Sequence, residues 1–201
     1  MSAPAFAVTF DYRCPFARNV HEHLVEAIRG GADWDVEFLA FSLSQSHVEE
    51  GEEAVWERPD KAPDLMAMEA GLVVRDRFPD RFLDVHLALF AARHDNGRDL
   101  RDEAVVRRVL DQAGVDADEV FAAIGEGWPR QEFRKEHEAA VAEHHVFGVP
   151  TFIAGDAAAF VRIMTRPEGD SQRARATIEH LVELLVIHPE LNEFKHTSIA
   201  R

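Results

Sequence analysis

Thiols are the scarcest feature of this 201-residue sequence, because Cys14 is its only cysteine. A single cysteine cannot form an internal disulfide framework. It also excludes a redox cycle in which two thiols of one chain close to a disulfide. Since a free thiol normally stays reduced in the cytoplasm, we expect the protein to be cytoplasmic.

Basic residues and long apolar runs are scarce as well. The chain has 22 Lys and Arg residues against 37 Asp and Glu residues, a formal net charge of -15. Such a surface repels the phosphates of nucleic acids and of anionic lipids, so we expect neither nucleic acid nor a membrane as a partner. Residues 184–187 form the longest apolar patch near the C-terminus and are too few to span a bilayer. Residues 1–7 lack the basic and then apolar segments of a secretory signal.

The first forty or so residues have the pattern of a β-α-β unit. Residues 5–11 alternate apolar with smaller or more polar side chains, which predicts a strand, and residues 35–43 are rich in Val and Phe. Between them, apolar residues recur at helical spacing after Pro15, which suits the first position of a helix. Gly30 can end that helix. Two strands joined in this way are expected to be parallel neighbours.

The middle of the chain is helical in pattern. Residues 48–143 contain almost no strand-like run, and glycines separate several segments with helical spacing. The expected helices, the last of which runs just past this block, cover residues 65–74, 81–93, 101–112, 118–124 and 131–145.

The C-terminal part returns to strands. Residues 151–154 and 158–163 flank a plausible hairpin turn at Gly155, and Asp170 or Ser171 can cap a last helix. The order is therefore β-α-β, a helical block, then α-β-β-α. This order predicts an α/β fold with a small mixed sheet and helices on both of its faces.

Two short motifs at opposite ends of the helical block carry a family resemblance. The stretch "FDYRCPFA", residues 10–17, resembles the strand-to-helix turn around the reactive cysteine of DsbA-like proteins in the thioredoxin superfamily. The stretch "VFGVPTF", residues 146–152, resembles the cis-proline loop that faces this cysteine. The resemblance implies a thioredoxin-like domain formed by residues 1–47 plus 144–201, with residues 48–143 as an inserted helical domain.

Cys14 is the candidate nucleophile. A cysteine at a helix N-terminus lies near unpaired N–H groups and the positive end of the helix dipole. We therefore expect its pKa to fall below the free value of about 8.5, with added positive potential from Arg13. The resemblance implies that a cis Pro150 presents the backbone of Val149 to a peptide or to a thiol such as glutathione. The residues implied to bind substrate are Arg13, Pro15, Phe16, Val149, Pro150 and Thr151.

Ala17 departs from the family pattern, because the dithiol oxidoreductases have a second cysteine at this position. A mixed disulfide on Cys14 would therefore need an external thiol for its release. This favours an oxidoreductase that acts through one thiol, by thiol–disulfide exchange or thiol-dependent reduction. We expect no tightly bound cofactor and a low-molecular-weight, glutathione-like thiol as cosubstrate. The other partner would be a thiol or disulfide substrate, either a small molecule or a peptide.

Two other functions remain open from the sequence. A lone nucleophile position also resembles the group of kappa-class glutathione transferases and 2-hydroxychromene-2-carboxylate isomerases, which use a single Ser there and activate bound glutathione. A non-enzymatic, ligand-binding paralogue is the third reading. In each case a homodimer is an open option.

The 11 histidines raise the question of a metal site. His137 and His144 share one face of an expected helix, with His145 beside them. No His-Glu-x-x-His motif or Cys/His spacing occurs, and zinc sites usually need three or four convergent ligands. We therefore predict no metal.

Overall fold

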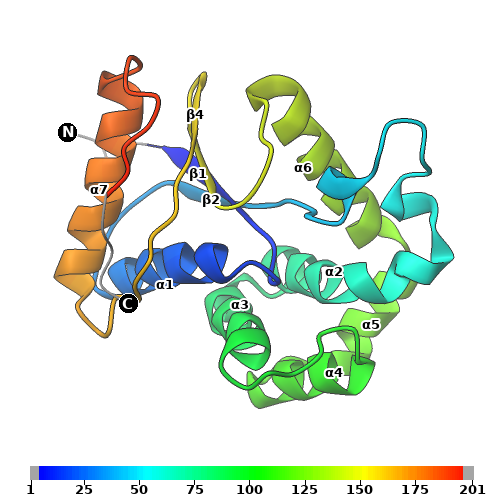
Figure 1. Cartoon of the computed structure of the whole chain (residues 1–201). Helices are drawn as coiled ribbons and strands as arrows, with labels where there is room; N and C mark the ends of the chain where they lie inside the picture. The colour runs from blue at the N-terminus through cyan, green and yellow to red at the C-terminus, as the bar shows by residue number, and fades with distance from the viewer. Residues whose placement is uncertain (1–4, 197–201) are drawn as a thin grey trace.

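The computed structural model describes residues 5–196; the expected outer limits of the thioredoxin-like domain, residues 1 and 201, lie outside this range. Its helices and strands follow one another along the chain in the order shown in Figure 1. They are β1 (Phe6–Phe10), α1 (Pro15–Arg29), β2 (Val36–Ala40), α2 (Ala62–Arg77), α3 (Pro79–His94), α4 (Glu103–Gln112), α5 (Ala117–Gly125), α6 (Trp128–His144), β3 (Thr151–Ala154), β4 (Ala157–Phe160) and α7 (Ser171–Ile187). Three short 3₁₀ turns connect β2 to α2.

The four strands form one mixed sheet in the order β2-β1-β3-β4. β1 pairs in parallel with β2, and β3 pairs antiparallel with both β1 and β4. The sheet lies between α7 and α6, and α1 packs against α7 (Figure 1). The expected α/β fold, with a β-α-β unit before the helical block and an α-β-β-α unit after it, is confirmed.

The expected helices are all present, but several begin earlier than their apolar spacing suggests. Pro63, Pro79 and Pro129 each stand in the first turn of a helix, where a missing N–H costs nothing. No helix within residues 5–196 combines the length and the apolar character needed to cross a membrane.

Two strands end earlier than expected, for different reasons. β2 stops at Ala40 instead of residue 43, and the N–H of Leu43 donates to the Asp11 carboxylate at 3.0 Å. β4 stops at Phe160 instead of residue 163. The N–H of Val161 still donates to the carbonyl of Pro150 at 3.1 Å, as the next rung between β3 and β4, but Pro150 has no N–H to donate in return, so the pairing ends here.

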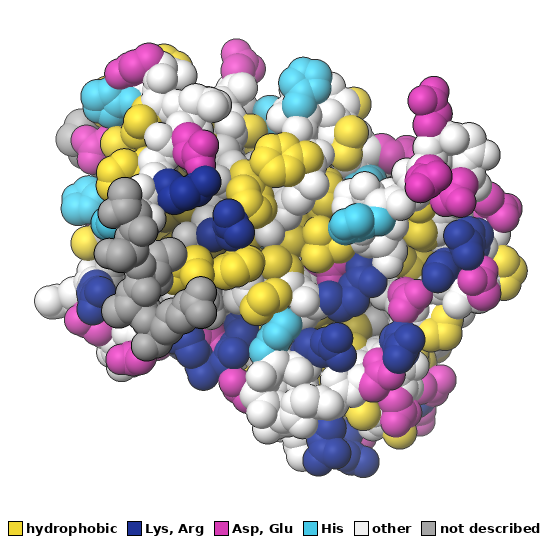
Figure 2. Space-filling model, viewed as in Figure 1, with side chains coloured by type: hydrophobic (Ala, Val, Ile, Leu, Met, Phe, Trp, Pro, Cys, Tyr) yellow, Lys and Arg dark blue, Asp and Glu magenta, His cyan; other side chains and the backbone are white. Residues whose placement is uncertain are grey.

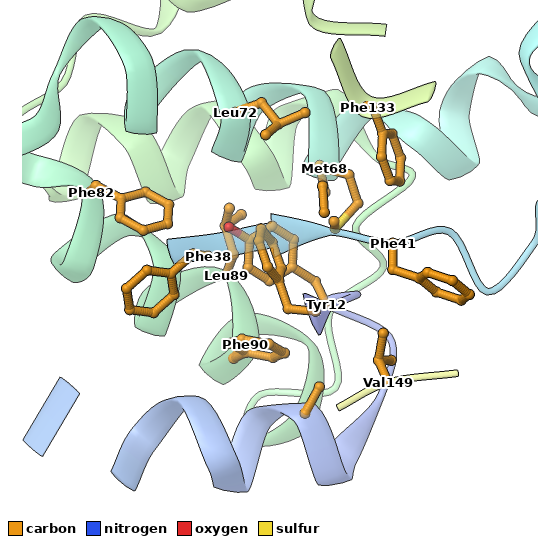
Figure 3. Close-up of a cluster of buried hydrophobic side chains, with 14 of the residues drawn as sticks. Tyr12, Phe38, Phe41, Met68, Leu72, Phe82, Leu89, Phe90, Phe133 and Val149 are labelled. Carbon is orange, nitrogen blue, oxygen red and sulfur yellow. The ribbon is translucent and has the colours of Figure 1, made fainter. Parts of the chain in front are cut away.

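One continuous hydrophobic cluster runs from the sheet into the helical block. Figure 3 shows Tyr12 near its centre, among side chains that include Phe38 of β2, Met68 of α2 and Phe90 of α3. The expected thioredoxin-like domain (residues 1–47 plus 144–201) and the expected inserted helical domain (residues 48–143) share this core. The division of the chain into these two domains therefore stays a prediction.

A chain of buried hydrogen bonds crosses the same region. The Tyr12 hydroxyl lies 3.0 Å from Nδ1 of His86, and Nε2 of His86 lies 2.9 Å from Nδ1 of His21. Nε2 of His21 is 3.3 Å from the carbonyl of Thr9, which can only accept. Burial lowers the pKa of both histidines, so both rings are neutral, and every bond in the chain then donates in the direction from Tyr12 to Thr9.

These buried histidines predict a loss of stability in acid. Burial lowers the pKa of His21 to about 3 and that of His137 to about 4, and it lowers the pKa of His86 well below its usual value. Since the unfolded chain takes up protons near pH 6.5 and the folded chain does not, stability is full above pH 6.5 and falls below it.

At pH 4.5 we expect His21 and His137 each to have removed roughly 2 to 3 kcal/mol of the free energy of unfolding, and His86 to act in the same direction. Urea unfolding curves between pH 7 and pH 4.5 measure this loss. The free energy of unfolding of each protein is expressed relative to its own value at pH 7. On acidification to pH 4.5, a His137→Gln variant should lose less of it than wild type does. An equal loss in the two proteins would contradict the assignment of part of the acid effect to His137.

Candidate active site

Cys14 caps the N-terminus of α1. Its backbone is extended, with φ -90° and ψ 118°, and Pro15 supplies the first helical residue. The N–H of Ala17 donates to the sulfur at 3.4 Å, as it would to the oxygen of a capping Ser or Asp. The cysteine N–H in turn donates to the carbonyl of Asp11 at 2.9 Å. The turn from β1 into α1 therefore fixes the sulfur at the helix end.

The loop before β3 meets this sulfur. The peptide bond between Val149 and Pro150 is cis, and the Cys14 thiol donates to the carbonyl of Val149 at 3.3 Å. Thr151 holds the loop in place. Its N–H donates to Oγ1 of Thr9 at 2.9 Å, and its hydroxyl donates to the carbonyl of Gly148 at 2.8 Å. The two motifs, 135 residues apart, thus form one site.

The expected low pKa of Cys14 is wrong. Its pKa is raised, mainly because burial removes water from the thiolate; the residue is 7% exposed. The backbone N–H groups of Ala17 and Phe16 lower the pKa, as expected for a helix N-terminus, and Arg162 lowers it further. Asp11 raises it. Desolvation outweighs the helix end, so the resting group is a thiol.

Arg13 does not present a free positive charge, contrary to our expectation. Its guanidinium pairs with the carboxylate of Asp11 at 2.8 Å and donates to the hydroxyl of Ser44 at 2.7 Å. The Asp11 carboxylate therefore balances the charge of Arg13. The pair ties the cysteine turn to the end of β2.

Two cavities adjoin Arg13. The larger, of about 450 Å³, has three cationic side chains and one acidic side chain, Glu52, in its wall, and each cation pairs with a carboxylate outside it. Its lining consists of Arg13, Leu43, Ser44, His47, Val48, Glu52, Val55, Arg58 and Lys61. The smaller, of about 300 Å³, lies between the cysteine turn and the helical block.

Pro15 and Phe16, which were also expected in the site, follow Cys14 at the start of α1. Pro15 is exposed and Phe16 is half-buried. The guanidinium carbon of Arg162 lies 5.3 Å from the centre of the Phe16 ring. Sequence reasoning missed Arg162 and Phe160, because residues 158–163 looked like a strand that packs in the core. Phe160 and Arg162 are two residues apart, so in an extended chain their side chains point to the same side, and this spacing could have indicated that they act together.

The histidines show no metal centre. Within residues 5–196, no three His, Cys, Asp or Glu side chains gather in a way that could hold a metal ion. His137 is buried, and its Nδ1 accepts from the N–H of Ser42 at 3.2 Å. His145 is exposed and caps α6 in a left-handed conformation.

Comparison with known proteins identifies a family. The model of the DSBA-like thioredoxin domain matches residues 7–165. The chain is 27% identical to the uncharacterized protein Rv2286c of Mycobacterium tuberculosis (strain ATCC 25618 / H37Rv) over 158 residues, which are 79% of this chain and 67% of that protein.

Two solved structures show the same fold. The 2-hydroxychromene-2-carboxylate isomerase is 14% identical, with a TM-score of 0.62 over 94% of this chain and 100% of that chain. The cytosolic disulfide reductase DsbM from Pseudomonas aeruginosa with GSH is 14% identical, with a TM-score of 0.61 over 90% of this chain and 100% of that chain.

Proposed function

Because the chain belongs to the DSBA-like thioredoxin domain family, we propose that it is an oxidoreductase that exchanges thiols and disulfides through Cys14 alone. The observation that carries this proposal is the contact of 3.3 Å between the sulfur and the carbonyl of Val149, next to the cis Pro150. A substrate that pairs with the backbone of Val149 displaces this contact and frees the thiol to lose its proton to water. The N–H of Ala17 and the charge of Arg162 then stabilise the thiolate.

The exchange has two steps that balance in atoms and electrons. The Cys14 thiolate attacks one sulfur of a substrate disulfide; a mixed disulfide forms, the substrate S–S bond breaks, and the leaving thiolate takes the electron pair. An external thiolate then attacks the mixed disulfide and regenerates Cys14, because Ala17 offers no second thiol. In this second step the bond between Cys14 and the substrate sulfur breaks, and that sulfur leaves in a mixed disulfide with the external thiol. A second external thiol must attack this mixed disulfide before both substrate sulfurs are thiols and the two external thiols are joined as a disulfide.

The external thiol is a carboxylate-bearing, glutathione-like molecule in this proposal. The larger cavity supports it, because Arg58 and Lys61 line it and it adjoins Arg13, the sequence neighbour of the nucleophile. Carboxylates bind such donors through charge-assisted hydrogen bonds. We place the reaction in the cytoplasm, where such thiols are kept reduced.

The raised pKa of Cys14 favours a second candidate function. A neutral thiol that donates a hydrogen bond could hold the sulfur of a bound glutathione-like thiolate, as a serine hydroxyl would. The protein would then be a glutathione-dependent transferase or isomerase, and Cys14 would form no covalent bond.

Intact-protein mass spectrometry separates these functions. After incubation with oxidised glutathione, we expect wild type to gain one glutathionyl group that reduced glutathione removes, and Cys14→Ser to gain none. Non-covalent binding of reduced glutathione to both proteins, without any adduct, would favour the transferase or isomerase. If the protein neither forms the adduct nor binds reduced glutathione, both enzymatic readings fail and a ligand-binding paralogue is left.

A further inference from the structure

The segment between β4 and α7 contains neither helix nor strand, and we call it the strap, residues 161–170. It runs from the sheet toward α1 and on to the start of α7 (Figure 1). The N–H of Val161 donates to the carbonyl of Pro150 at 3.1 Å. Further along, the carbonyl of Ile163 accepts from the side-chain amide of Asn19 in α1 at 3.0 Å. The first part of the strap is therefore held between the cis-proline loop and α1.

Four charged side chains fasten the next part of the strap to α1 and to the end of α3. We call them the ion cluster: Arg18, Glu22, Asp95 and Arg166. Arg166 of the strap donates to both oxygens of the Glu22 carboxylate, at 2.6 and 2.8 Å, and lies 3.6 Å from the Asp95 carboxylate. Arg18 donates to the same two carboxylates. The side chains of Arg18 and Glu22 are each 11% exposed, so solvent screens their charges less than those of a surface ion pair. The bidentate bond of Arg166 then fixes the strap on α1.

Arg162 lies between these anchors and reaches the first turn of α1. Its guanidinium carbon is 5.3 Å from the centre of the Phe16 ring and 5.8 Å from that of the Phe160 ring. Figure 2 shows hydrophobic and basic side chains next to one another in the middle of this face. Arg162 is exposed and forms no ion pair in the part of the chain that the structure describes. Its charge is therefore held near the start of α1, where Cys14 caps the helix.

The charged groups that act on the Cys14 thiol include one on the strap and one in the cysteine turn. Arg162 lowers the pKa of Cys14, and the buried Asp11 raises it. Asp11 is fixed, because its carboxylate accepts from Arg13 and from the N–H of Leu43. The position of Arg162 on the strap is therefore the adjustable part of this balance.

We propose that Glu22 and Arg166 are positioning residues for the reaction of Cys14, because they hold the strap so that Arg162 stays beside the start of α1. The guanidinium there favours the charged thiolate once the proton leaves. When the ion cluster opens, the strap loses an anchor and Arg162 spends less time near the sulfur. This inference rests on the proposed function, since it names a control on the nucleophile that exchanges thiols.

The pH profile of alkylation by iodoacetamide tests the proposal on the full-length protein. The reagent is neutral and reacts with the thiolate, so its rate follows the ionisation of Cys14. We expect Arg162→Gln to move the midpoint of the profile upward and to slow alkylation at pH 7 roughly threefold. Glu22→Gln should also slow it. Removing the negative charge of Glu22 would by itself speed alkylation, so the slower rate shows that Glu22 acts through the strap.

Two further variants sharpen this test. Asn19→Ala removes an uncharged anchor of the strap and should also slow alkylation, although it alters no charge and favours the helix. Glu26→Gln is the matched control, because it removes the same charge from α1 at a carboxylate that makes no ion pair among the described residues. It should not slow alkylation. The double variant Glu22→Gln/Arg162→Gln should be as slow as Arg162→Gln alone.

Several results would overturn the proposal. They are an unchanged rate in Arg162→Gln, faster alkylation in Glu22→Gln, and additive slowing in the double variant. Urea unfolding shows whether each variant is folded under the assay conditions. If Glu22→Gln does not fold, the pair Asn19→Ala and Asn19→Ala/Arg162→Gln decides by the same rule.

Salt and a disulfide separate the strap from the proposed function. In about 1 M sodium chloride, where the Debye length is about 3 Å, wild type should slow toward the rate of Arg162→Gln, and that variant should change little. An equal salt effect on the two proteins would contradict the role of Arg162. If oxidised glutathione forms no adduct while the variants are alkylated as expected, the proposed function fails and the positioning of Arg162 by the strap stands.

Discussion

Ala17→Cys converts the monothiol site into a dithiol site. The N–H of residue 17 already donates to the Cys14 sulfur at 3.4 Å, and positions three apart in a helix face each other at about 5 to 6 Å between Cβ atoms. This separation is close to the range that a disulfide needs. A thiol held there competes with external thiols at a high effective concentration.

The expected result is a change in how the mixed disulfide is released. In wild type the release rate is proportional to the concentration of added thiol. In Ala17→Cys the release rate becomes independent of that thiol. Without added thiol, Ala17→Cys should release on the order of a hundredfold faster than wild type, or more. Stopped-flow release of an aromatic thiol from preformed mixed disulfide measures both rates. Ala17→Ser is the control for the added bulk at this fully buried position. A release rate that still follows the external thiol in Ala17→Cys would contradict the proposed geometry.

Gly71→Ala strongly destabilises the fold, although alanine is the better helix former. A Cβ at position 71 would lie 2.4 Å from the hydroxyl oxygen of Tyr12 and 3.0 and 3.1 Å from two of its ring carbons. Tyr12 is 1% exposed and hydrogen-bonded to His86, so its ring has no free space to move into. The gain in helix propensity is about 1 kcal/mol, and the forced displacement of a buried, hydrogen-bonded ring outweighs it.

We expect Gly71→Ala to lower the free energy of unfolding by on the order of 3 kcal/mol, measured by urea denaturation. Gly125→Ala is the matched control, because a Cβ at this helical position meets no atom within 4 Å and the substitution should be neutral or stabilising. If Gly71→Ala were as stable as Gly125→Ala, the packing of Tyr12 against α2 would be wrong.

Local sequence patterns were sufficient for the fold. Pro15, the alternating strand before it and the segment around Pro150 predicted both halves of the site and their place around the helical block. These features depend on neighbours within a few residues, so they can be recognised without three-dimensional information. The ends of β2 and β4 could not be predicted in this way, because they depend on distant residues: Asp11 accepts the N–H of Leu43 after β2, and Pro150, which has no N–H, is the partner of Val161 after β4.

The electrostatics of the site depend on contacts that no local pattern contains. The pKa of Cys14 follows from burial against Val149, which is 135 residues away in the sequence, and the helix end alone predicted the opposite shift. Arg13 looked like a free cation because its ion pair with Asp11 depends on the shape of the turn. Arg162 was missed because its position beside Phe16 depends on the path of the chain after β4.

The one-way chain of hydrogen bonds from Tyr12 to Thr9 limits how the site can open. Swinging the helical block away from the sheet would leave His86, Tyr12 and His21 without partners inside the core, at about 1 to 3 kcal/mol for each unpaired group. A large hinge motion between the helical block and the sheet is therefore unfavourable. Reactants therefore have to reach Cys14 without a large separation of the helical block from the sheet.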